Sequence, residues 1–177
     1  MKASSAAERR AIAVLEDSGV AELPVPVEQI ARGLGAQITY ESFDGEISGM
    51  LYRDHGTTVI GVNSRHAATR QRFTVAHEIG HLLMHRGQAV FIDRFVRVNW
   101  RDGQSNREEA QANAFAAELL MPRAFVQEEI ERALSRRRVV TPQGLAGVLA
   151  KRFEVSAAAM QYRLINLEIL DPYSLAD

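Results

Sequence analysis

The sequence contains no cysteine, no long apolar run and no excess of charge of either sign. Without cysteine, a metal site in this chain cannot use thiolate ligands, and the composition fits a reducing compartment. No stretch approaches the roughly 18 apolar residues of a membrane-spanning helix, and residues 1–10 lack the apolar segment of a signal peptide. The formal net charge of −1 predicts no general attraction to nucleic acid or to an anionic membrane surface. We therefore expect a cytoplasmic protein that does not bind membranes.

Patterns of apolar residues and turn formers predict an α+β fold. The 177 residues, 46% of them hydrophobic, fit one domain or a core with a small appendage. Short β-rich runs at residues 36–41, 47–53 and 57–62, separated by turn residues, predict a small antiparallel three-stranded sheet. Residues 89–98 are expected to form either a further strand or a mobile flap. The predicted helices cover residues 5–18, 25–34, 67–85, 105–121, 124–135, 142–153 and 156–167.

One five-residue motif, His77-Glu78-Ile79-Gly80-His81, lies in an apolar helical stretch. Side chains four residues apart lie on the same face of a helix, so His77 and His81 can each direct a ring nitrogen to one metal ion. Glu78 is rotated by about 100° from His77, which places its carboxylate beside the metal, where it can take a proton from water. This is the H-E-x-x-H pattern of zinc peptidases. Because glycine costs about 1 kcal/mol inside a helix, Gly80 predicts a close approach of another backbone or of a substrate.

A catalytic zinc ion usually has three protein ligands and a water molecule, so one more ligand is required. His85 continues the histidine stripe, but it lies about 12 Å along the helix from His77, too far for all three rings to share one ion. We expect His85 at the helix end, where a cation suits the helix dipole. His55 and His66, in a predicted turn and a predicted loop, are weaker candidates.

Residues 105–121 offer a better third ligand in Glu109. Glu109 shares a helix face with small residues, so its carboxylate should be buried and needs a partner, which a zinc ion can supply. Asn113, one turn further on, could accept the second ring N–H of a ligating histidine and fix its orientation. Glu108 and Glu118 are the alternative ligands, although both are expected to face solvent.

Residues 70–81, followed by residues 109–122, resemble the ImmA/IrrE family of zinc metallopeptidases, which are gluzincin-like H-E-x-x-H endopeptidases. The resemblance is strong over residues 47–122 and weaker towards the C-terminus. It implies that Glu109 is the third ligand. Many family members have glutamate where this chain has Gln111, a departure at a position that the spacing does not favour as a ligand.

The resemblance also implies an architecture and a partner. We expect a zincin-like metallopeptidase core in residues 1–122, with the sheet packed on the active-site helices, and a C-terminal helical subdomain in residues 123–177. The implied substrate is a helix-turn-helix transcriptional repressor, whose cleavage would relieve repression under stress or mobile-element induction.

The predicted site implies hydrolysis of a peptide bond. His77, His81 and Glu109 would hold the zinc ion, leaving the fourth position for water and substrate, while the motif glutamate serves as general base and then as acid. Mn²⁺ or Fe²⁺ could compete for two histidines and one carboxylate. Because zincin-type peptidases commonly bind substrate along an edge strand, we expect it at Thr57–Val62, or second at Ile47–Arg53.

The C-terminal part suggests an alternative function. Residues 142–167 resemble a helix-turn-helix, with Ser156 as the cap of the second helix. A recognition helix needs several polar or basic side chains that are free to reach DNA. The few candidates here are Gln161, Tyr162 and Arg163. The alternative is therefore a DNA-binding or protein-binding regulator with a non-catalytic metal site, but we expect this bundle to dock the substrate or to pack on the core.

Overall fold

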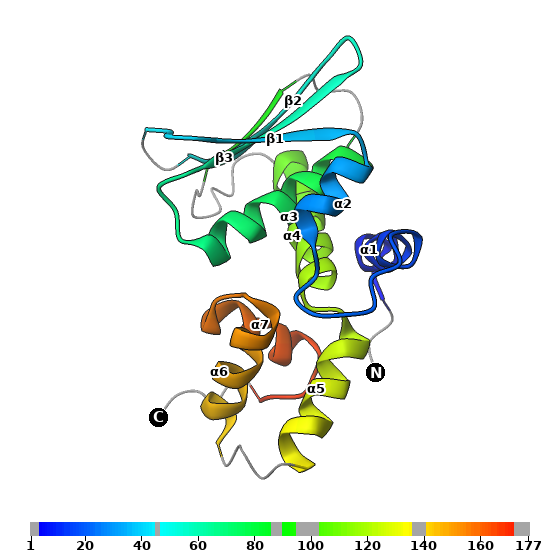
Figure 1. Ribbon diagram of the computed structural model, residues 1–177, viewed down its shortest axis with the longest axis vertical. Coiled ribbons are helices and arrows are strands. Elements are labelled where there is room, and N and C mark those ends of the chain that lie inside the picture. Colours follow the sequence, from blue (N-terminus) through cyan, green and yellow to red (C-terminus); the bar gives the residue numbers. More distant parts are fainter. Residues whose placement is uncertain (1–3, 45–46, 86–89, 95–102, 136–140, 172–177) are drawn as a thin grey trace.

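The computed structural model of the chain describes residues 4–44, 47–85, 90–94, 103–135 and 141–171. These residues form a small sheet and seven helices stacked along one long axis (Figure 1). The sheet lies at one end with α2 (Val27–Gly33) and α3 (Ala68–Met84) beneath it, followed by α4 (Gly103–Leu120) and α1 (Ala6–Asp17). The opposite end consists of α5 (Arg123–Ser135), α6 (Pro142–Phe153) and α7 (Ala157–Asn166). The predicted α+β class is confirmed, and within the described ranges no helix has the length and hydropathy needed to cross a bilayer.

The described part of the sheet has four strands in the order β1 (Ala36–Glu41), β3 (Thr57–Asn63), β2 (Ile47–Asp54) and β4 (Val90–Arg94). β2 and β3 form the expected antiparallel hairpin, with His55 and Gly56 in the turn at φ angles of 42° and 84°. β1 instead pairs with β3 in parallel. The prediction of a purely antiparallel sheet is therefore wrong in the direction of β1, and β4 adds a fourth strand from the segment for which a further strand was one of two expectations. A two-residue turn forces antiparallel pairing, whereas the longer link from β1 to β2 leaves the partner of β1 to tertiary packing.

The two strands predicted to bind substrate, β3 and β2, lie between β1 and β4 inside the sheet. β3 pairs with β1 and β2, and β2 pairs with β3 and β4, so neither has a free edge. The expectation that a substrate adds to Thr57–Val62 or Ile47–Arg53 as a new strand is therefore wrong, because β-augmentation needs unpaired backbone groups. Of the segment expected to be a strand or a flap, β4 is a strand, whereas residues 89 and 95–98 lie outside the described residues.

Side-chain caps set where three helices begin. Ser5 and Glu8 form a capping box on α1, with the Glu8 backbone N–H donating to Ser5 Oγ at 3.2 Å and the Ser5 N–H donating to Glu8 Oε2 at 2.6 Å. Thr141 caps α6. Ser156 caps α7 as predicted, accepting from the backbone N–H of Ala159 at 3.1 Å. Each cap stabilises its helix by about 1 kcal/mol.

Gly80 of α3 lets α4 approach closely. A β-carbon added at Gly80 would lie 3.1 Å from Ala112 Cα and 3.3 Å from Phe115 Cδ1. The close approach predicted from a glycine inside the motif helix is confirmed, and the neighbour is another helix. The crossing also brings Glu109, three residues before Ala112, towards the histidines of α3. The hydrophobic core of the described residues includes these fully buried side chains: Leu51, Ile60, Ile79, Phe115, Leu119, Phe153 and Leu164.

Candidate metal and active site

Two helices bring the three predicted metal ligands together. His77 and His81 lie one turn apart on α3, with their Nε2 atoms 3.0 Å apart. Glu109 of α4 faces them, with Oε2 3.2 Å from His77 Nε2 and Oε1 3.2 Å from His81 Nε2. Ligand atoms about 2.1 Å from a tetrahedral zinc ion stand roughly 3.4 Å from one another, so these atoms converge at nearly the spacing that one ion requires. In the described part of the chain, these three side chains form the group close enough to share a metal ion.

Burial and hydrogen bonding set the charge of this group. Burial lowers the pKa of His81 and so favours the neutral imidazole that binds metal. Burial acts in the opposite direction on Glu109, but hydrogen bonds with His77 and His81 outweigh it and hold the pKa of Glu109 below its ordinary value. The Glu109 side chain is 40% exposed, less buried than its small-residue helix face suggested. Two imidazole nitrogens and one ionised carboxylate suit a divalent metal ion, and the residues present therefore fit the zinc that the motif predicts.

Glu78 is completely buried and lies against the sheet. β2 reaches it through Gly49, because a β-carbon there would lie 3.3 Å from Glu78 Oε1, would stand 2.9 Å from the carbonyl oxygen of Gly61 and would overlap Thr74 Cγ2. Glycine at position 49 is what allows the strand to pass so close to the carboxylate. Gly49 was not predicted as a site residue, although a glycine inside a predicted strand is a signal of close backbone approach.

The second ring nitrogen of each motif histidine has a partner. His77 Nδ1 lies 3.0 Å from Asn113 Oδ1, which is the position expected of Asn113. His81 Nδ1 lies 2.9 Å from His85 Nδ1, and His85 Nε2 lies 3.1 Å from Gln111 Oε1. His85 does end α3, as expected, but it is buried and contacts the ring of His81. This contact between His85 and His81 was not predicted, although His85 continues the spacing of four residues.

The remaining candidates lie outside the ligand group. Glu118, expected to face solvent, is buried and forms an ion pair with Arg163, so that prediction is wrong because α7 covers this face of α4. Glu108, the other alternative ligand, does not join the group. His55 lies in the turn between β2 and β3 with a side chain that is 94% exposed, and His66 follows β3 at the approach to α3.

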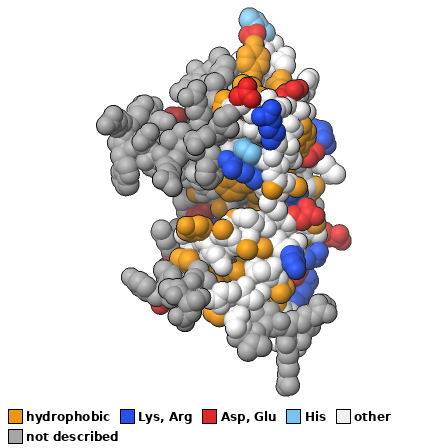
Figure 2. All heavy atoms as spheres, turned by 90° about the vertical axis from the view of Figure 1, so that its left-hand side faces the viewer, with side chains coloured by type: hydrophobic (Ala, Val, Ile, Leu, Met, Phe, Trp, Pro, Cys, Tyr) orange, Lys and Arg blue, Asp and Glu red, His pale blue; other side chains and the backbone are white. Residues whose placement is uncertain are grey.

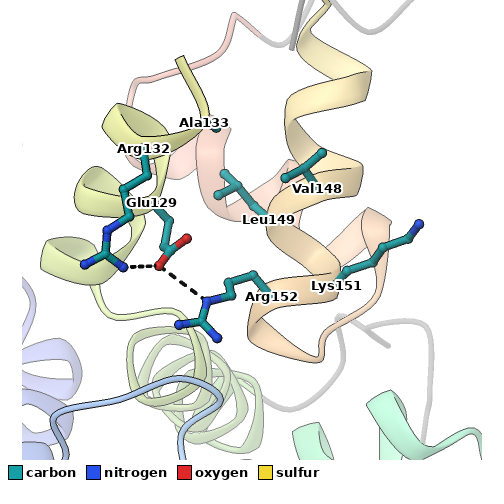
Figure 3. Close-up of a pocket in the computed structure, with 7 residues that line it drawn as sticks. All are labelled: Glu129, Arg132, Ala133, Val148, Leu149, Lys151 and Arg152. Carbon is teal, nitrogen blue, oxygen red and sulfur yellow. Dashed lines mark hydrogen bonds and ion pairs between the residues drawn. The ribbon is translucent and has the colours of Figure 1, made fainter. Parts of the chain in front are cut away.

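A groove of about 500 Å³ lies between α5 and α6, away from the predicted metal ligands on α3 and α4. Figure 3 shows Arg132 and Arg152 reaching the same carboxylate, that of Glu129, from the two helices. Val148 and Leu149 line the groove from α6. Its basic groups are partly neutralised by this ion pairing, and its lining includes none of the predicted site residues. The groove therefore belongs to the packing of the C-terminal helices.

Comparison with known proteins bears on this site. A peptidase family described as the IrrE N-terminal-like domain matches residues 31–165, which include the motif helix and Glu109. The chain belongs to this family. The predicted ImmA/IrrE resemblance, and with it the assignment to a metallopeptidase family, is confirmed.

Two relatives show how far the similarity extends. The radiation response metalloprotease IrrE of Deinococcus radiodurans is 37% identical over 109 residues, which cover 60% of this chain and 30% of that protein. The metallopeptidase ImmA of Bacillus subtilis is 28% identical over 115 residues, which cover 59% of this chain and 66% of that protein. The matches thus span less than two thirds of either relative.

Proposed function

We propose that this chain is a zinc-dependent endopeptidase in which His77, His81 and Glu109 bind the metal ion and Glu78 transfers protons. One observation carries the proposal: ring nitrogens and carboxylate oxygens from two helices converge at 3.0–3.2 Å, next in sequence to a fully buried glutamate. Structural zinc sites usually have four protein ligands, whereas this group supplies three. Membership of a peptidase family supports the same interpretation.

The residues divide the work of peptide hydrolysis. A bound zinc ion would lower the pKa of a water molecule to about 7 and polarise the carbonyl of the scissile bond. Glu78 accepts a proton from the attacking water and then delivers it to the leaving amine. Asn113 accepts from the ring of His77 and so keeps Nε2 of that ring directed at the ligand group.

Metal content and activity, measured on the same preparations, test this proposal. Untagged wild-type protein should contain about one zinc ion per chain by mass spectrometry. Glu78→Gln should keep the zinc and lose cleavage, whereas Glu109→Ala should lose both. The measurement also identifies the metal, since Mn²⁺ and Fe²⁺ suit the same ligand set. Absence of metal from the reconstituted wild type would overturn the proposal, and full activity of Glu78→Gln would overturn the role of Glu78.

We further infer that the substrate is a helix-turn-helix transcriptional repressor in the cytoplasm, cleaved to relieve repression under stress or mobile-element induction. Family membership supports this inference, as does the name of one relative, a radiation response metalloprotease. The test is incubation of the metal-loaded protein with repressors encoded near its gene, using Glu78→Gln as the inactive control. Repressors that stay intact even under the inducing signal would contradict this substrate.

The alternative function is a DNA-binding or protein-binding regulator with a non-catalytic metal site. One of the three side chains that could contact DNA in this alternative is not accessible. Arg163, one of three side chains available for DNA, is buried in an ion pair with Glu118, whereas Tyr162 is 70% exposed. Figure 2 shows basic and acidic side chains sharing one face of the molecule, where a DNA-binding surface would gather basic ones. A salt-dependent gel shift with specific DNA would favour the alternative.

We also propose that residues 1–122 form the metallopeptidase core and residues 123–177 a C-terminal helical subdomain. The boundary falls between α4 and α5, and the described helices that follow it gather at one end of the molecule (Figure 1). Arginine side chains reach across the boundary, since Arg163 pairs with Glu118 and Arg152 donates to the carbonyl oxygen of Leu23 at 3.3 Å. Limited proteolysis that cuts first near residue 122 would support this division.

A further inference from the structure

The ring of His81 is held on the side that faces away from Glu109. Its Nε2 lies 3.2 Å from Glu109 Oε1, and its Nδ1 lies 2.9 Å from His85 Nδ1. His85 Nε2 in turn lies 3.1 Å from Gln111 Oε1 on α4. This series of contacts begins and ends on α4, the helix that carries Glu109, and it passes through two buried rings: that of His81 in α3 and that of His85, which caps α3.

The donors and acceptors of this chain of contacts can be assigned without ambiguity once His81 binds metal through Nε2. His81 then carries its hydrogen on Nδ1 and donates it to His85 Nδ1. Because His85 accepts at Nδ1, it carries its own hydrogen on Nε2 and donates it to the carbonyl oxygen of Gln111. An amide oxygen can only accept, so this series of hydrogen bonds ends there with every donor and acceptor paired.

The backbone at the end of α3 is fixed from the other side by the sheet. Arg53 of β2 donates to the carbonyl oxygen of His81 at 2.8 Å and to that of His85 at 3.0 Å. The His81 carbonyl also accepts from the backbone N–H of His85 at 3.0 Å, so the guanidinium group is a second donor there and supplies a partner for the His85 carbonyl beyond the helix end. The ring of His81 and the backbone that carries it are therefore both held in place.

We propose that His85 and Gln111 are positioning residues for the metal site: through hydrogen bonds they hold His81 in the tautomer and ring orientation that direct Nε2 to the metal ion. The inference rests on the proposed function, since it assumes that His81 is a ligand. Hydrogen-bonding partners of ligating histidines typically change metal affinity by about 10- to 100-fold when removed.

Two pairs of variants separate this role from simple packing. His85→Leu and Gln111→Leu each break the chain of contacts, and each should weaken zinc binding by about 10- to 100-fold in competition with a chromophoric chelator. His85→Asn can still accept from His81, and Gln111→Glu can still accept from His85, so both should keep most of the wild-type affinity. In Co²⁺-substituted protein, the two leucine variants should also shift the visible absorption bands, which report ligand geometry.

Controls distinguish a lost positioning role from misfolding and from a failure of the proposed function. Gln127→Leu makes the same chemical change at an exposed position of α5 and should leave zinc affinity unchanged. Should His85→Leu fail to fold, Gln111→Leu, at a partly exposed position, still gives an answer. Wild-type affinity and spectra in both leucine variants, or equal losses in the leucine and conservative variants, would overturn the positioning role. A wild-type protein that binds no zinc would instead overturn the proposed function.

Discussion

Arg163 of α7 and Glu118 of α4 form an ion pair in which both side chains are at least 96% buried. Arg163 also donates through Nε to the carbonyl oxygen of Met121 at 3.0 Å, and Glu118 Oε1 accepts from the backbone N–H of Arg123 at 3.1 Å. The same guanidinium lies 3.7 Å from Glu8 of α1. One cation thus joins α7 to α1 and to α4, the helix that carries Glu109.

Removal of Arg163 should destabilise the whole chain. Arg163→Met leaves the Glu118 carboxylate buried without its ion-pair partner, and breaking such a pair typically costs about 3–5 kcal/mol. Urea denaturation followed by circular dichroism measures the change. Arg132→Met, at a side chain that is 49% exposed, is the control and should cost less than about 1 kcal/mol. A loss for Arg163→Met no larger than for the control would show that the pair contributes little.

Stability should fall at acidic pH in part through Glu8. Burial tends to raise the pKa of Glu8, but hydrogen bonds from Ser5 and the charge of Arg163 outweigh it, so the pKa lies below its ordinary value. A carboxyl group whose pKa is lower in the folded than in the unfolded state stabilises the fold at pH values above its unfolded pKa, which is about 4.3 for glutamate. This contribution is lost as the pH falls through the folded pKa. Glu8→Gln should therefore show a smaller loss of unfolding free energy between neutral and acidic pH than wild type. An unchanged pH dependence would contradict this assignment.

Gly49→Ala should impair the proposed active site without removing the proposed metal ligands. The new methyl group would overlap Thr74 Cγ2 and would lie only 3.3 Å from Glu78 Oε1, so the strand and the carboxylate must move apart. A displacement of about 1 Å in a catalytic group can reduce the rate roughly 100-fold. Cleavage assays and zinc content, measured together, should show lost activity with retained metal. Thr74→Ser removes the obstructing methyl group but leaves the 2.9 Å contact with the Gly61 carbonyl oxygen, so the double variant should regain only part of the activity. Full activity of Gly49→Ala alone would contradict the clash.

Gly80→Ala should destabilise the protein although alanine is the better helix former. The added β-carbon would lie 3.1 Å from Ala112 Cα, so the backbone of α4 must give way by a few tenths of an ångström, and we expect this shift to draw Glu109 away from the histidines. We expect lower zinc affinity and a lower melting temperature. The matched control is Gly147→Ala in α6, where no atom lies within 4 Å of an added β-carbon and the change should stabilise by up to about 1 kcal/mol. Equal stabilisation by both substitutions would contradict the close helix crossing.

The helices and strands could be predicted because their signals are local. Ser156 follows a turn and precedes a helical stretch, and its cap on α7 is observed. The direction of β1 could not be predicted, because alternation of side chains identifies a strand but not its neighbour. Glu118 was expected in solvent for a similar reason: the burial of one face of α4 depends on α7, which comes much later in the chain.

By itself, the sequence determined that His77 and His81 share one face and that Glu78 stands beside them, because the geometry of a helix over five residues is local. It also determined that Gly80 needs a close neighbour, since a glycine inside a helix is otherwise unfavourable. Only the tertiary structure decided which segments meet there. The crossing of α3 and α4 places Glu109 opposite the histidines and Gln111 beside His85, and β2 brings Gly49 to Glu78. Such contacts join residues far apart in sequence, and they depend on how the whole core packs.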